Sequence, residues 1–202
     1  HGLRLVFDCP FPSSSPASPV FHLDTRSGRV HERVHNHPDS NGWRPRVSLP
    51  REMFPHLTTC TTAGTAISTM PGVYRYTINR ISQVVDRAIK IGIPMVALFP
   101  KNKNSLKNES GSESLNENNL VCKGIIEIKK RYKNKIGIMC DVALDPYTSH
   151  CHDGLIRSNQ IVNDETIEIL VNQSLLQAEM GCDVLAPSDM MDGRIGKIRK
   201  AL

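Results

Sequence analysis

From residue 66 onward, helical and strand-like patterns alternate along the chain, and this alternation constrains the fold more than any other feature of the sequence. Amphipathic helix patterns cover four segments, at residues 76–92, 120–132, 161–180 and 192–201. Short continuous apolar runs follow the first three, at residues 95–100, 136–144 and 182–186, as is typical of buried parallel strands. The pattern predicts an α/β fold, either an open doubly wound sheet or a closed (β/α)8 barrel.

Turn and capping residues support these helix boundaries. Gly92 and Gly181 suit the ends of the first and third helices, where a left-handed backbone is common. Asn163 or Asp164 suits the start of the third helix, and Asp192 suits the start of the fourth. No glycine-rich phosphate loop follows any strand, which weighs against a dinucleotide-binding fold.

Residues 1–65 differ in composition from the rest of the chain. They hold seven arginines, no lysine, no isoleucine and eight of the thirteen prolines. Only Leu3–Phe7 resembles a strand, so we expect a separate, mostly unstructured segment before a domain at 66–202. The segment is either a transit peptide or upstream sequence joined to the chain by gene prediction. It contains more acidic residues than transit peptides usually carry, which weighs against the first origin. Both cytoplasm and plastid are compatible with it.

Charge, cysteine content and hydropathy exclude several classes of protein. The net charge of +5 is modest, and the main basic run at 129–135 lies at a predicted helix end, so we expect no nucleic-acid partner. No apolar run reaches the ~18 residues of a membrane-spanning helix, so we expect no membrane partner. The six scattered cysteines form no CxxC pair, which favours a reducing compartment. Residues 101–118 are polar and predict a surface loop of low functional weight.

Two predicted strands end in polar residues, which would lie at the carboxyl rim where barrel enzymes carry their chemistry. Within the second run, Asp141 interrupts an apolar strand, and Asp145, Asp153, two histidines and Cys151 follow within thirteen residues. Such a cluster could bind a metal, or it could transfer protons through carboxylates with shifted pKa values. The alternative is a solvated loop without chemistry. After the third run, Ser188 and Asp189 offer a hydroxyl and a carboxylate at the same rim, whereas Arg194 fits a helix-surface salt bridge.

Four segments in this order closely resemble the delta-aminolevulinic acid dehydratase (porphobilinogen synthase) family: ISTMPGVYRY at 67–76, DVALDPYTSHCHDG at 141–154, NDET at 163–166 and APSDMMDGR at 186–194. The resemblance covers residues 67–202. It implies a (β/α)8 barrel with an N-terminal arm, homo-oligomers that are usually octamers, and condensation of two 5-aminolevulinate molecules to porphobilinogen with loss of two waters. It also implies catalytic roles for Asp141, Ser188 and Asp189.

The resemblance is to the aspartate-rich type of the family. Positions of three zinc-binding cysteines in animal and yeast relatives correspond here to Ala143, Asp145 and Asp153. Carboxylate oxygens suit magnesium better than zinc, so we expect magnesium as the cofactor, at Asp145 and Asp153 or at a site outside this chain. Cys151 stands where the family usually has a glycine. We interpret it as an inert loop cysteine rather than as a zinc ligand.

The resemblance also implies two Schiff-base lysines on later strands, and neither stretch occurs before Leu202. We therefore expect an incomplete barrel with about strands two to four, inactive alone and with unpaired strand edges. The alternative is a noncatalytic truncated homologue, or a product of gene prediction, that serves at most as an interaction module in the oligomer.

Overall fold

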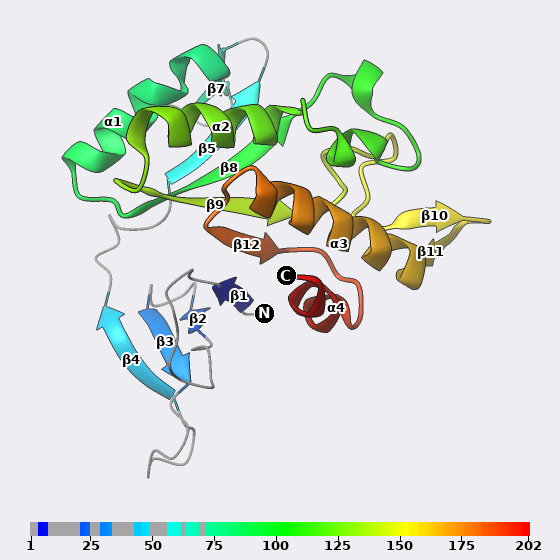
Figure 1. Ribbon diagram of the computed structural model, residues 1–202. Coiled ribbons are helices and arrows are strands. Elements are labelled where there is room, and N and C mark those ends of the chain that lie inside the picture. The colour runs from blue at the N-terminus through cyan, green and yellow to red at the C-terminus, as the bar shows by residue number, and fades with distance from the viewer. Residues whose placement is uncertain are drawn as a thin grey trace.

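The computed structural model describes the backbone of residues 4–7, 21–24, 29–33, 43–48, 56–61, 64–68 and 72–202, and the side chains of 64–68 and 72–202. A mixed ten-stranded sheet, parallel at its centre and antiparallel toward both ends, carries helices packed along it (Figure 1). The strands of this sheet are β1 (Arg4–Phe7), β2 (Phe21–Asp24), β3 (Arg29–Arg33), β4 (Trp43–Ser48), β5 (His56–Thr61), β6 (Thr65–Ala66), β7 (Tyr74–Thr77), β8 (Met95–Lys101), β9 (Gly137–Val142) and β12 (Val184–Pro187). A separate hairpin pairs β10 (Leu155–Arg157) with β11 (Gln160–Val162).

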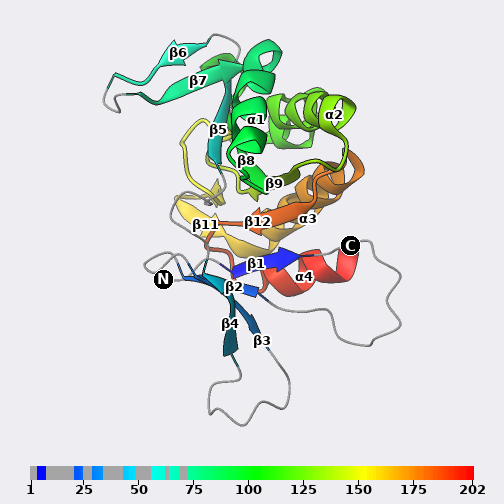
Figure 2. The ribbon, with the colours of Figure 1, turned by 90° about the vertical axis from the view of Figure 1, so that its left-hand side faces the viewer.

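The helices are α1 (Ile81–Lys90), α2 (Leu120–Tyr132), α3 (Asn163–Glu179) and α4 (Arg194–Ala201), with 3-10 turns η2 (Ile78–Arg80), η3 (Asn104–Leu106) and η4 (Ser112–Leu115). Figure 2 shows α1, α2 and α3 on the same face of the sheet. Within the described ranges, none of these helices has the length and apolar character needed to cross a membrane.

The central strands run parallel, and their order follows the chain. In the sheet β5, β8, β9 and β12 lie side by side, each hydrogen-bonded in parallel to the next. Sequential neighbours with helices on one face are the arrangement of part of a (β/α)8 barrel, whereas a doubly wound sheet reverses its strand order. This confirms the α/β, partial-barrel expectation.

The two edges of the parallel strands are paired, contrary to expectation. The antiparallel strand β1 pairs with β12, and β7 pairs in parallel with β5 on the other side. These pairings satisfy backbone groups that an open edge would expose. Within residues 1–65 the structure describes strands β1 to β5 and the start of β6, and most of the segment lies outside the described ranges, so the expectation of a mostly unstructured segment stays a prediction. The sequence predicts β5 only weakly, because this strand contains no apolar run and its strand preference comes from β-branched threonines.

Several predicted boundaries differ from the structure. Tyr76 belongs to β7, because the chain pairs with β5 there before it turns into α1. The fourth helix is preceded by Gly193 in a left-handed conformation rather than capped by Asp192. Asn163 is the first residue of α3 and caps nothing within it. Its amide instead exchanges two hydrogen bonds with the backbone of Asp192, at 2.8 and 3.2 Å, and so joins the two helix starts.

Side chains alternate between the two faces of the sheet, as the strand period of two requires. Val96 and Leu98 of β8 join Ile138 and Cys140 of β9 in the core under α1 and α2. The intervening positions make a smaller apolar cluster on the opposite face, from residues Ala97, Met139, Val184 and Ala186 with Met95 and Phe99 at its margin. In a barrel this helix-free face is the interior.

Asp183 ties the strands of the core together just before β12 begins. Its carboxylate accepts a 2.7 Å hydrogen bond from the Ile138 amide and contacts Lys129 Nζ of α2 at 2.7 and 2.8 Å. One side chain thereby connects β9, β12 and α2.

Replacing Asp183 with Ala is expected to lower the free energy of unfolding by about 2 kcal/mol, because the Ile138 amide loses its acceptor and Lys129 its counter-ion. Urea unfolding measures the change. Glu109→Gln, at an exposed carboxylate, is the matched control and should leave the unfolding free energy unchanged within about 0.5 kcal/mol. Equal stability of the Asp183 variant and the parent would contradict this role.

Candidate active site at the carboxyl ends of β8, β9 and β12

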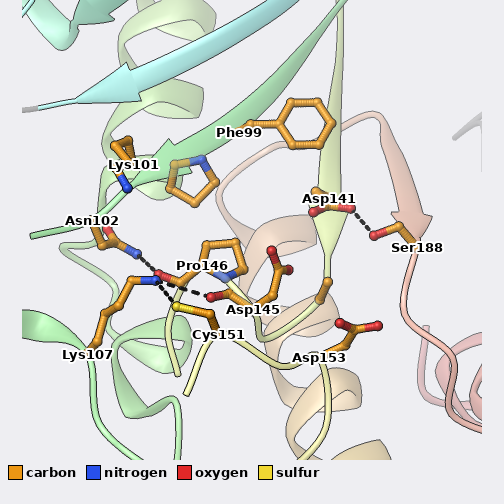
Figure 3. A pocket seen from close by; sticks show the side chains of 12 residues that line it. Phe99, Lys101, Asn102, Lys107, Asp141, Asp145, Pro146, Cys151, Asp153 and Ser188 are labelled. Carbon is orange, nitrogen blue, oxygen red and sulfur yellow. Dashed lines mark hydrogen bonds between the residues drawn. The ribbon is translucent and has the colours of Figure 1, made fainter. Parts of the chain in front are cut away.

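A cavity of about 490 Å³ opens where β8, β9 and β12 end (Figure 3). Its charged and hydroxyl-bearing lining residues are Lys101, Lys107, Asp141, Asp145, Asp153 and Ser188. Figure 3 shows the lysines on one side and Asp141, Asp153 and Ser188 on the other. The structure thus brings together four of the five residues predicted for the site, from two strand ends and one loop.

Asp141 and Ser188 form the centre of the acidic side. Ser188 Oγ donates a 2.5 Å hydrogen bond to Asp141 Oδ1. Both residues continue the alternation of the helix-free face, since Asp141 is two residues after Met139 and Ser188 two after Ala186. The parallel register places Ala186 opposite Asp141, so the two side chains meet at the rim.

The pKa of Asp141 is raised to about 6 from a usual 3.8. Burial is the largest cause, and the charges of Asp145, Asp189 and Asp153 add to it, while the Ser188 hydrogen bond acts in the opposite direction. A carboxyl group with this pKa exchanges its proton close to neutral pH, as general acid–base catalysis requires.

Two buried glutamines of α3 hold the end of β9 in place. Gln177 Nε2 donates to the Asp141 carbonyl at 3.0 Å, and Gln173 Nε2 donates to the Ala143 carbonyl at 3.3 Å. The glutamines are four residues apart and therefore lie on one face of the helix. Their role is not visible in the sequence, because polar residues inside an amphipathic helix usually face solvent.

Asp145 and Asp153 crowd the acidic side with further negative charge. Partial desolvation and then the charge of Asp153 raise the pKa of Asp145, whereas Lys107 acts to lower it. Carboxylates gathered this closely favour a cation or a proton among them.

Asp189 does not line the cavity but lies buried on the other side of the chain. Its Oδ1 accepts a 2.7 Å hydrogen bond from the Met191 amide, and its Oδ2 forms an ion pair with Arg194 Nε at 2.8 Å. Burial raises the pKa of Asp189, whereas the backbone hydrogen bonds and the charge of Arg194 act to lower this pKa. Arg194 is partly exposed and pairs with the buried Asp189 carboxylate rather than with another residue on the helix surface, and the pair fixes the turn that follows Ser188.

The two histidines of the loop are used to shape it. His150 Nδ1 accepts from the His152 amide at 3.2 Å, and His152 Nδ1 accepts from the Gly154 amide at 3.0 Å. Cys151 between them has a left-handed backbone with φ of 57°. The customary glycine at this position would adopt that conformation without strain.

Three lining residues come from the polar segment 101–118, for which the sequence predicts low functional weight. Lys101 is the last residue of β8, Asn102 follows it, and Lys107 lies further along the loop. The loop's composition predicted only a solvated surface. Its proximity to the acidic residues depends on the parallel pairing of β8 with β9, which carries both loops to the same rim.

The fold and this polar rim define a (β/α)8-barrel protein with a carboxylate-rich site. A family model described as delta-aminolevulinic acid dehydratase matches residues 48–202, and the chain belongs to this family. The match begins ahead of the boundary between residues 65 and 66 that composition predicts.

Individual relatives agree with the family match. The chain is 54% identical over 136 residues to delta-aminolevulinic acid dehydratase of Bradyrhizobium diazoefficiens, covering 67% of this chain and 38% of that protein. It is 46% identical over 140 residues to the chloroplastic delta-aminolevulinic acid dehydratase 1 of Arabidopsis thaliana, covering 68% of this chain and 32% of that protein. The chain thus spans well under half the length of these relatives.

A solved structure is similar over most of the chain. It is delta-aminolevulinic acid dehydratase (porphobilinogen synthase) from Toxoplasma gondii ME49 in complex with the reaction product porphobilinogen. The TM-score is 0.72 at 30% identity, covering 90% of this chain and 54% of that chain.

Replacing Asp141 with Asn is expected to stabilise the fold at neutral pH. The folded-state pKa of about 6 lies above the usual 3.8, so the parent chain loses stability as the pH rises from about 4 through 6. The amide stays uncharged, and the variant should be more stable by on the order of 1–3 kcal/mol at about pH 7, with no difference at about pH 3. Urea unfolding at both pH values measures this, and a variant less stable at neutral pH would refute it.

Proposed function

We propose that this chain is part of a porphobilinogen synthase, a lyase of tetrapyrrole and heme biosynthesis that condenses two 5-aminolevulinate molecules with loss of two waters. The observation that carries the proposal is the Asp141–Ser188 pair on the helix-free face, where a carboxyl group titrates near neutral pH. Family membership and the product-bound relative support the same reaction.

The residues of this chain suit the binding and proton-transfer parts of that reaction. 5-Aminolevulinate carries an ammonium group, a ketone and a carboxylate, and the cavity offers carboxylates on one side and Lys101 on the other. Asp141 orients the substrate and passes protons to and from it, and Ser188 holds the amine or hydroxyl of an intermediate. Asp189 acts through its ion pair with Arg194, which sets the position of Ser188.

The Schiff-base lysines implied by the family resemblance lie, in this proposal, on barrel strands beyond residue 202. Those strands would complete the cavity wall. We also propose that the complete protein is a homo-oligomer, and that it works in the cytoplasm or a plastid, since the plant relatives are named chloroplastic.

The donor set of the acidic loop suits magnesium better than zinc. Among the residues that the structure describes, no group of three or more His, Cys, Asp and Glu side chains could hold a metal ion. Protein zinc sites use at least three such ligands, whereas magnesium is commonly held by one or two carboxylates and several waters. Asp145 and Asp153 would hold it, and a bound magnesium would supply positive charge to stabilise developing negative charge.

Activity provides the direct test of this function. In the full-length protein that contains this chain, Asp141→Asn should lower kcat by about 100-fold or more, because general acid–base catalysis contributes at least that much. Porphobilinogen formation from 5-aminolevulinate is the assay, and Glu109→Gln should retain parental turnover. A parent protein that binds 5-aminolevulinate without forming porphobilinogen would instead indicate the noncatalytic homologue.

The metal assignment has a separate test. A zinc-selective chelator should leave porphobilinogen formation intact, because the acidic loop offers oxygen ligands and its histidines bond to their own backbone. Titration of magnesium into metal-free protein should raise turnover. Loss of activity with the chelator that zinc restores and magnesium does not would assign a zinc site to Cys151 and the neighbouring histidines.

A further inference from the structure

The polar loop after β8 packs along the acidic loop after β9 rather than extending into solvent. The Ser149 amide donates to the Asn108 carbonyl at 3.0 Å, and the Asn108 amide donates to the Tyr147 carbonyl at 3.3 Å. Gly111, with φ of 61°, lies so close that an added Cβ would be 3.5 Å from Thr148. The two loops therefore form one continuous structure at the rim.

Asn102 anchors the beginning of this contact. Its side chain is only 3% exposed, and its Nδ2 donates a 3.1 Å hydrogen bond to the Pro146 carbonyl. Pro146 directly follows Asp145, so the anchor lies next to a carboxylate of the site.

Lys107 makes the contacts nearest to the cavity. Its Nζ donates to the Asp145 carbonyl at 3.3 Å and to Cys151 Sγ at 3.5 Å (Figure 3). These acceptors are six residues apart, at the two ends of the turn that contains Tyr147 and Ser149. A single ammonium group thus joins both ends of the turn, and hydrogen bonds from charged donors are stronger than neutral ones.

We propose that Lys107 is a positioning residue of the active site, which holds the turn from Asp145 to Cys151 so that the Asp145 carboxylate faces the cavity. Its catalytic consequence rests on the proposed porphobilinogen synthase function, but its structural action does not. Lys107 acts through the acidic loop, and the substrate contacts belong to Asp141 and Ser188.

Three variants separate this role from packing and from direct substrate binding. Lys107→Met keeps the aliphatic stem and removes the charge, whereas Lys107→Arg keeps a cation. Lys103→Met is the matched control, because Lys103 is exposed in the same loop and does not line the cavity.

Backbone hydrogen exchange in the 202-residue chain tests the structural action without any activity. Lys107→Met should speed exchange of the Ser149 and Cys151 amides by about 10-fold, as expected when a local contact opens more easily. Lys107→Arg and Lys103→Met should stay within about 2-fold of the parent. Unchanged exchange in Lys107→Met, or equal acceleration in Lys107→Arg, would overturn the proposal.

Kinetics of the full-length protein test the catalytic consequence. Lys107→Met should lower kcat about 10-fold with KM nearly unchanged, because displaced catalytic groups cost turnover, and Lys107→Arg should recover most of it. A raised KM with unchanged kcat would show that Lys107 binds substrate directly and would overturn the positioning role. If the parent forms no porphobilinogen, the proposed function fails, and hydrogen exchange alone decides the role of Lys107.

Discussion

The parallel pairing of β9 with β12 is the constraint on which the site depends. Its register sets Ala186 opposite Asp141, and the two-residue period then directs Asp141 and Ser188 to the same helix-free face. A shift of one residue in either strand would turn its polar side chain toward the helices. Asp183 fixes this register by joining Ile138 and Lys129 at the other end of the strands.

The carboxylates of the site repel one another, and neighbouring residues hold the backbone around them. Burial together with neighbouring carboxylates keeps the pKa of Asp141 high, which opposes stability at neutral pH but suits proton transfer. The glutamines of α3, the Asp189–Arg194 pair and the loop that carries Lys107 hold the surrounding backbone. Catalytic groups require such support from neighbouring residues to keep a productive geometry.

The pairing of β1 with β12 covers a strand edge of this chain. In a complete barrel, both edges of every strand bond to parallel neighbours. Here an antiparallel strand from the compositionally distinct N-terminal segment occupies one edge of β12. Its pairing satisfies the backbone groups along that edge, which would otherwise favour association with another chain.

The sequence by itself determined the alternation of helices and strands, the polar strand ends and the membership of Asp141 and Ser188 in one rim, because burial period and chain order are local properties. It did not reveal β5, whose threonine-rich segment lacks an apolar run, nor the separation of Asp189 from Ser188 onto opposite faces of the chain. The functional weight of Lys107 was also hidden, since a solvated lysine and one bonded to a distant carbonyl have the same local sequence. Only the tertiary structure decided these points. β5 and Lys107 depend on contacts with distant segments, such as the 38-residue separation of Lys107 and Asp145, and the direction of Asp189 depends on the folded turn that brings Met191 and Arg194 to its carboxylate.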